Sequence, residues 1–172
     1  MLNNQNINLR LLQIEDAPML LNWRFSQEAY SYFYEWNVNG EAQCEKWIAN
    51  SLNKNNEMNF VIQTNDNVAI GIISLVDIDY RNRKCEMGRV LIGNKDFRGK
   101  KFGEQAIQLL LEYAFNHLNI RKVYCEVLSN NNVAENLYKK CGFVEDGFFK
   151  NHIYKNGKYI DVIHMAIENN KF

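Results

Sequence analysis

Hydrophobic positions recur along this chain with two periods, which together predict a mixture of strands and helices. Apolar runs with strand character cover residues 7–12, 59–63, 68–76, 85–92, 122–127, 143–154 and 159–166. Apolar residues spaced by three and four predict helices starting near Pro18, over residues 40–53 and 131–140, and from residue 103 to about Leu118. The order strand, helix, strand, helix in the second half predicts two parallel central strands with a right-handed crossover.

Turn residues mark two hairpins in this pattern. Asn65, Asp66 and Asn67 separate two strand runs, and Asn156-Gly157 separates the last two. The chain has 172 residues, of which 47% are hydrophobic, enough for one compact core. Since no repeat or linker divides it, we expect a single domain over residues 1–172.

Composition limits the classes of partner. The chain has 20 basic and 20 acidic residues, so its charge predicts neither a nucleic-acid nor a membrane partner. It shows no apolar N-terminal leader or membrane-spanning run, and we expect a cytoplasmic protein. Its four cysteines and three histidines lack the spacing of a metal site, so we expect no metal and no Cys/His nucleophile.

A basic, glycine-bearing loop lies between a strand and the longest predicted helix. Helix-start N–H groups have no internal partners and sit at the positive end of the dipole, so they can hold a phosphate. The alternative is a basic loop that only caps the helix. The candidate cofactor residues are Arg98, Gly99, Lys100, Lys101, Phe102 and Gly103.

The loop narrows the choice of cofactor. It is neither a P-loop nor a Gly-x-Gly-x-x-Gly dinucleotide motif. It resembles the Arg/Gln-x-x-Gly-x-Gly/Ala loop of the GCN5-related N-acetyltransferases (GNAT family), in which loop amides hold the diphosphate of acetyl-CoA. Lys101 stands where that family usually has glycine, and a positive φ there costs about 1–2 kcal/mol.

A second motif strengthens the resemblance. Residues 131–143 match the acetyltransferase pattern Asn-x-x-Ala-x-x-Leu-Tyr-x-Lys-x-Gly-Phe at every specified position. The resemblance implies an α/β GNAT fold, with a mixed, splayed sheet of about seven strands and helices on both faces. It also implies that the two central strands splay near Gly88 to admit the thioester, with acetyl-CoA as cosubstrate.

Three residues are candidates for proton transfer. By resemblance, Tyr138 is the general acid that protonates the departing thiolate, although it could also be a core tyrosine. Deprotonation of the amine calls for a carboxylate, and Glu126 and Glu86 lie on strands beside the expected cofactor. Glu126 could equally be a structural partner of a neighbouring cation.

The remaining cofactor contacts also follow from the resemblance. The strand Val90, Leu91 and Ile92 is expected to lend its backbone to the pantetheine amides, as a strand added to a sheet edge would. Asn131 is expected to cap its helix, to reach the pantetheine arm, or both.

The aromatic N-terminal third is the candidate acceptor cleft, although part of it would serve only to cover the sheet. It is similar to acetyltransferases of pseudaminic acid synthesis, which implies a UDP-linked 4-amino-4,6-dideoxy sugar as acceptor. Cys44 replaces a histidine that is common in that group. The proposed acceptor-binding residues are Trp23, Arg24, Tyr30, Tyr34 and Trp47.

Other acceptors stay open. The chain also resembles spermidine acetyltransferases and acetyltransferases of ribosomal-protein N-termini, although residues 34–40 hold few carboxylates for a polycation. A non-catalytic acyl-CoA-binding module is the alternative of another class. The C-terminal hairpin could pair across a homodimer.

Overall fold

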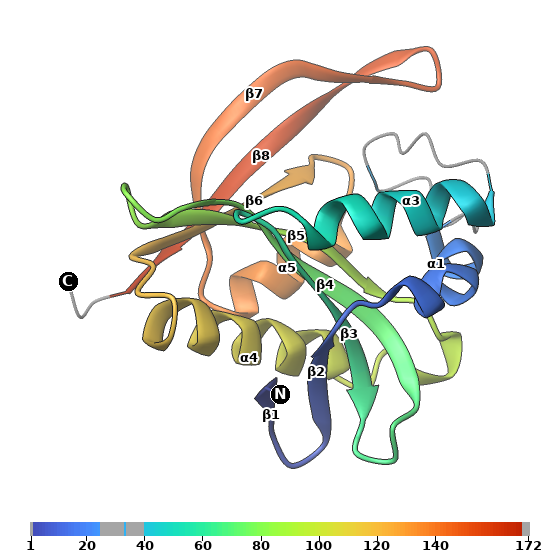
Figure 1. Cartoon of the computed structure of the whole chain (residues 1–172). Coiled ribbons are helices and arrows are strands. Elements are labelled where there is room, and N and C mark those ends of the chain that lie inside the picture. Colours follow the sequence, from blue (N-terminus) through green and yellow to red (C-terminus); the bar gives the residue numbers. More distant parts are fainter. Residues whose placement is uncertain (1, 25–32, 34–39, 170–172) are drawn as a thin grey trace.

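The described residues form one mixed sheet. The computed structural model describes residues 2–24, 33 and 40–169. Within them the strand order is β1-β2-β3-β4-β5-β6-β8-β7 (Figure 1). The strands are β1 Leu2–Asn3, β2 Ile7–Leu11, β3 Met58–Thr64, β4 Ala69–Asp79, β5 Lys84–Ile92, β6 Lys122–Leu128, β7 Val144–Lys155 and β8 Lys158–Glu168. The seven predicted strands are present, and the eighth, β1, has only two residues.

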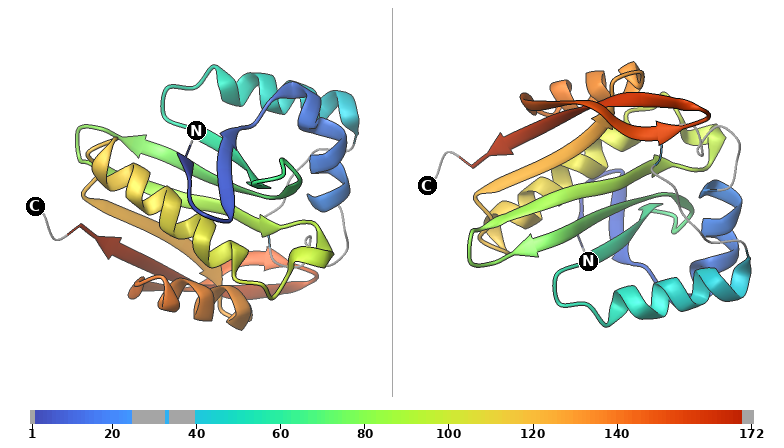
Figure 2. Two further views of the ribbon diagram at one scale, coloured as in Figure 1. Left: turned by 90° about the horizontal axis from the view of Figure 1, so that it is seen from below. Right: turned by 90° about the horizontal axis from the view of Figure 1, so that it is seen from above.

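Helices cover both faces of the sheet, as predicted. They are α1 Ala17–Arg24, α3 Glu41–Leu52, α4 Phe102–Asn116 and α5 Asn132–Lys140, with single 3-10 turns at Ile14–Asp16 and Lys95–Phe97. Figure 2 shows α4 crossing one face, with α5 beside it, whereas α1 and α3 lie on the other face.

Strand alternation divides the apolar side chains between these two faces. Phe60 and Ile62 of β3 belong to the larger cluster, which α4 covers, whereas Val61 between them joins the smaller cluster with Leu20 of α1 and Ile48 of α3. We call the side of α1 and α3 the acceptor face, because the candidate acceptor residues lie there.

The two central strands pair only briefly. β5 and β6 run parallel, as predicted, and their register covers Lys84↔Lys122, Cys85↔Val123 and Glu86↔Tyr124. Beyond Glu86, β5 continues to Ile92 with its ladder on the β4 side alone. The splay predicted near Gly88 is therefore confirmed, and it begins directly after Glu86.

β5 also carries a bulge at the splay. Ile72 lies opposite Leu91 and Ser74 lies opposite Gly88, so β5 has one residue more than β4 in this interval. Within it Arg89 has a φ of 56°, in the left-handed region. That conformation costs a non-glycine residue about 1–2 kcal/mol, so other contacts must hold it.

The last two strands form the predicted hairpin. Lys155 lies opposite Lys158 across Asn156 and Gly157, whose φ values of 51° and 78° are those of a two-residue type I′ turn. The hairpin extends beyond the body of the protein, as Figure 1 shows. Among the described residues, no helix is long and apolar enough to cross a membrane.

Candidate functional site

The cofactor loop leaves β5 and enters α4 through two residues of positive φ. Gly99 has a φ of 72° and Lys101 a φ of 64°. Lys101 therefore adopts the left-handed conformation that glycine usually takes at this position in the family motif. Arg98 Nε donates to the Ile92 carbonyl oxygen over 2.9 Å, which ties the loop to the end of β5. Lys101 is the N-cap of α4 and has no side-chain cap bond.

The start of α4 presents backbone N–H groups without partners inside the helix. The first helical turn closes when Gln105 N–H donates to Lys101 O at 3.1 Å, so the N–H groups of residues 102–104 point out of the helix end. A Cβ placed on Gly103 would lie in ordinary van der Waals contact with Leu137 Cδ2, at 3.5 Å. Lys100 Nζ lies 5.6 Å from the Phe97 ring centroid.

The strand expected to hold pantetheine lies directly at the splay. Val90 and Ile92 pack against the larger cluster and Leu91 against the smaller one. Their backbone edge toward β6 lies beyond the last β5–β6 pair. Asn131 caps α5 by accepting from Ala134 N–H at 3.1 Å, so the capping role predicted for its side chain is the one observed.

Tyr138 approaches the splay from α5. It is 8% exposed, and its ring centroid lies 5.9 Å from that of Phe143. Burial, followed by the neighbouring Cys125 and Cys141 and by Glu86, raises the pKa of Tyr138 above the usual tyrosine range. Its hydroxyl therefore stays protonated at neutral pH.

Glu86 is a carboxylate whose proton affinity is raised by its surroundings. Burial, followed by the charges of Glu126 and Asp77, raises the pKa of Glu86 to about 7, whereas Arg89 lowers it. The same surroundings raise the pKa of Tyr124 to about 12, chiefly through burial. The structure thus brings both predicted carboxylates together at the splay and adds Asp77, which the sequence analysis missed.

The sequence gives only weak evidence that Asp77 belongs to the site. Asp77 follows the apolar run of β4 and has a φ of 47°, where the strand becomes irregular. Glu126 of β6 lies opposite His164 of β8 in the register. The ring of Tyr124, also on β6, stacks on the His164 ring, with centroids 5.1 Å apart. The three carboxylates thus come from adjacent strands, Asp77 from β4, Glu86 from β5 and Glu126 from β6.

Three of the proposed acceptor-binding residues, Trp23, Arg24 and Trp47, lie on the acceptor face, and we call them the aromatic wall. Trp23 lies against Gly93, since a Cβ there would be 2.1 Å from Trp23 Cγ. Arg24 is buried with Cζ 4.2 Å from the Phe33 ring centroid, and burial, then the charge of Arg89, lowers its pKa to about 9. Trp47 lies 5.1 Å from Arg89 Cζ. Tyr30 and Tyr34 lie outside the described residues.

A polar network beside this wall was not predicted. Arg89 Nη1 donates to Glu57 Oε1 at 2.9 Å and to Asn59 Oδ1 at 3.0 Å. Ser74 Oγ donates to the same Asn59 oxygen at 2.6 Å. These residues are far apart in the sequence and have no motif, so only the sheet register reveals them.

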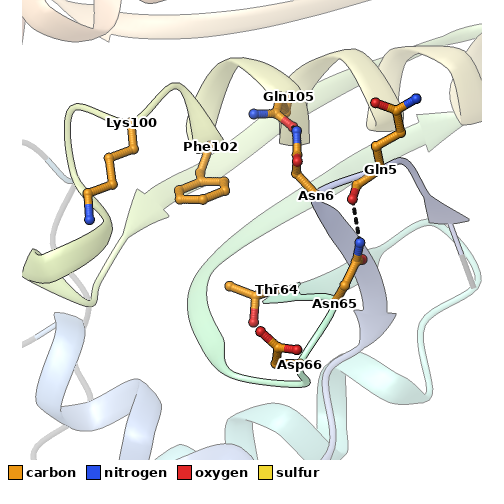
Figure 3. Close-up of a pocket in the computed structure, with 8 residues that line it drawn as sticks. All are labelled: Gln5, Asn6, Thr64, Asn65, Asp66, Lys100, Phe102 and Gln105. Atoms are coloured by element: carbon orange, nitrogen blue, oxygen red, sulfur yellow. Dashed lines mark hydrogen bonds between the residues drawn. The ribbon is translucent and has the colours of Figure 1, made fainter.

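A separate cavity of about 440 Å³ lies beside the cofactor loop, between the β1–β2 turn, the β3–β4 turn and α4 (Figure 3). Its lining residues are Gln5, Asn6, Thr64, Asn65, Asp66, Lys100, Phe102 and Gln105. It shares Lys100 and Phe102 with the loop but contains neither Tyr138 nor the carboxylates. Across residues 2–24, 33 and 40–169, no group of three or more His, Cys, Asp or Glu could hold a metal ion.

The coupling of the carboxylates can be measured. Glu126→Gln removes the largest charge that raises the pKa of Glu86, so carboxyl NMR titration should place that pKa below about 7. Glu135→Gln is the control, because its carboxylate pairs with Lys139 on α5 and should leave Glu86 unchanged. An unaltered Glu86 titration in Glu126→Gln would show that the two carboxylates do not interact.

The chain resembles known proteins in its domain type, its sequence and its fold. Residues 6–144 match the acetyltransferase (GNAT) domain model. The spermidine N(1)-acetyltransferase of Vibrio cholerae is 31% identical, over 98% of this chain and 96% of that protein. A crystal structure of the spermidine N-acetyltransferase from Vibrio cholerae with CoA and spermine has a TM-score of 0.89, at 31% identity and 98% coverage of both chains.

A dodecameric structure of that enzyme in an intermediate state has a TM-score of 0.83, at 30% identity, covering 98% of this chain and 96% of that one. The predicted GNAT fold and acetyl-CoA-dependent N-acetyltransferase activity are thus confirmed. These relatives match the spermidine alternative rather than the amino-sugar acceptor. The chain belongs to the acetyltransferase (GNAT) family.

Proposed function

We propose that this N-acetyltransferase moves the acetyl group of acetyl-CoA to a primary amine of a polyamine such as spermidine. The observation that carries the proposal is the convergence of Asp77, Glu86 and Glu126 at the splay, which the raised pKa of Glu86 reflects. Clustered carboxylates attract a polycation over a monovalent amine. The similarity to spermidine acetyltransferases supports the same acceptor.

A polycationic acceptor needs negative charge nearby, and residues 34–40 hold few acidic groups. The negative charge comes instead from β4, β5 and β6, on three separate stretches of sequence. An amino-sugar nucleotide is the second candidate, since Arg24 and Arg89 on the acceptor face could meet its phosphates. Arg89, however, is already paired with Glu57 at 2.9 Å, which reduces its availability for an anion.

The cofactor would lie along the loop and the splay. The N–H groups of residues 102–104 would hold the diphosphate, with Arg98, Lys100 and Lys101 adding positive charge. The backbone of Val90, Leu91 and Ile92 would pair with the pantetheine amides, on the edge that β6 leaves open. Bound there, acetyl-CoA supplies an activated acetyl thioester.

Glu86 would act as the general base. An amine with a lysine-like pKa of about 10.4 needs roughly 4–5 kcal/mol to present its neutral form at pH 7. A carboxyl group whose pKa is about 7 is half ionised at neutrality and can take up that proton. Glu126 would keep the pKa of Glu86 high and help to hold the cationic acceptor.

Tyr138 would act as the general acid. Its hydroxyl is buried and protonated, and the charge of Glu86 is among the influences that raise its pKa. The hydroxyl would donate its proton to the departing CoA sulfur as the amine nitrogen bonds to the acetyl carbon. The base and the acid are thus on different elements, β5 and α5.

The acceptor can be tested by CoA-thiol release with spermidine, a UDP-linked 4-amino sugar and a peptide with a free N-terminus. We expect the highest kcat/KM with spermidine. Asp77→Asn should raise KM for spermidine several-fold, because one attractive charge is lost. Asp66→Asn, an exposed carboxylate in the β3–β4 turn, should not. Preference for the amino sugar would overturn the polyamine proposal.

The acid role predicts a separation of turnover from binding. Tyr138→Phe should lower kcat by roughly 10²-fold, the usual contribution of a general acid, while CoA affinity by calorimetry stays nearly constant. Tyr113→Phe is the matched control, because Tyr113 packs edge-on against Phe60 on the α4 side of the sheet. Undiminished kcat in Tyr138→Phe would leave Tyr138 as a core residue.

We also propose that the chain self-associates through the β7–β8 hairpin. Near its tip, the rings of Tyr154 and Tyr159 lie with their centroids 5.0 Å apart, tilted by 57°, although the residues are 61% and 64% exposed. Light scattering should give a multiple of the 20.3 kDa chain, and Tyr154→Glu with Tyr159→Glu should reduce it. Tyr80→Glu, at an exposed residue outside the hairpin, is the control. A monomeric wild-type protein would contradict this proposal.

A further inference from the structure

The β5 bulge lies between the proposed base and the proposed cofactor strand. Met87, Val90 and Ile92 all pack into the cluster under α4. In a regular strand residues 87 and 90 would point to opposite faces. Because of the extra residue at the bulge, Glu86 lies on the acceptor face while Val90 and Ile92 still pack against the core cluster under α4.

The residue at the bulge is held by its side chain. Arg89 adopts a positive φ without being glycine, and its guanidinium is bonded to Glu57 at 2.9 Å and to Asn59 at 3.0 Å. Its side chain is 25% exposed, whereas that of Glu57 is 5% exposed. Trp47 of α3 lies on its other side, 5.1 Å from the ring centroid to Cζ.

The partners of Arg89 are themselves fixed. Asn59 Nδ2 donates to Glu57 Oε1 at 3.0 Å, and Lys54 Nζ donates to Glu57 Oε2 at 2.8 Å. Burial alone would raise the pKa of Glu57, but the bonds from Lys54 and Asn59 and the charge of Arg89 outweigh it and lower that pKa. Glu57 is thus an ionised anchor.

The network crosses the sheet at the bulge itself. Ser74, which donates to Asn59 at 2.6 Å, is the β4 residue directly opposite Gly88. Asn59 Oδ1 of β3 thus accepts both from Arg89 of β5 and from Ser74 of β4, the strand between them. If the bulge were lost and residues 90–92 slipped by one position against β4, their side chains would exchange faces.

We propose that Arg89 is a positioning residue for acetyl transfer: clamped by Glu57 and Asn59, it fixes the β5 bulge and hence the spacing between Glu86 and residues 90–92. The clamp also places a positive charge beside the carboxylates. This inference rests on the proposed roles of Glu86 and of the cofactor strand.

The charged and titratable groups around Glu86 lie on four elements. Glu126 and Tyr124 lie on β6, Asp77 on β4, Arg89 on β5 and Tyr138 on α5. Of these, Arg89 is the one that lowers the pKa of Glu86. Loss of Arg89 should therefore shift the acidic limb of kcat/KM to higher pH, because Glu86 acts only when deprotonated.

The experiment compares Arg89→Met with Arg10→Met in the full-length chain. Arg10 is a matched control, because it makes a two-bond ion pair with Asp16, at 2.7 Å for each bond, on the β2 side of the sheet. Hydrogen exchange of the peptide covering residues 87–92 is read without any acceptor. Turnover is read with whichever amine the wild type acetylates fastest.

We expect faster exchange over residues 87–92 in Arg89→Met but not in Arg10→Met. We further expect kcat to fall roughly tenfold or more, as for misplaced catalytic groups. Arg89→Lys should recover part of that loss, and the acidic limb should return with it. Adding Glu57→Gln to Arg89→Met should change kcat little further, because one network has already been broken.

Two results would overturn the inference. Unchanged exchange over residues 87–92 in Arg89→Met would show that Arg89 does not hold the bulge. Faster exchange with unaltered kcat and an unmoved acidic limb would show that the bulge does not position the reaction. Failure of spermidine as acceptor would overturn the proposed function alone, because neither of these results depends on the identity of the amine.

Discussion

The early end of the β5–β6 ladder is the constraint on which the rest of the structure depends. Parallel neighbours normally satisfy each other's backbone groups along their whole length, and buried backbone groups seldom go unpaired. Here pairing stops after Glu86↔Tyr124, and β5 goes on to Ile92. The cofactor loop continues from the end of β5, and Tyr138 approaches from α5. The parts of the site are thus grouped around one interruption of the sheet.

The interruption also explains the balance of charge on the acceptor face. Carboxylates crowded beside an apolar core hold protons more tightly, which is why the pKa of Glu86 reaches about 7. Arg89 opposes this effect from the adjacent bulge, while Glu57 compensates its charge from the far side. A cationic acceptor would therefore meet net negative charge at the splay and a neutralised arginine beyond it.

Much of this architecture follows from local sequence, because strand alternation, helical spacing and the Asn156-Gly157 turn act over a few residues. The cofactor loop and the capping role of Asn131 follow equally from short motifs. Asp77 and the Glu57–Asn59–Ser74–Arg89 network do not, since their proximity depends on register and on a bulge that no local pattern encodes. The aromatic stretch that suggested an amino-sugar acceptor is contiguous in the sequence, whereas the carboxylates that support the proposed polyamine acceptor come together only in the folded sheet.

The open edge of β5 has a consequence for the lifetime of the protein. If pantetheine completes the sheet there, acetyl-CoA serves as a missing strand, and its binding adds directly to the free energy of unfolding. At a concentration one hundred times its Kd the gain is about 2.7 kcal/mol, a large fraction of the stability of an ordinary domain. The abundance of the folded enzyme would then follow the acetyl-CoA supply of the cell, so that a starved cell would lose the protein as well as its substrate.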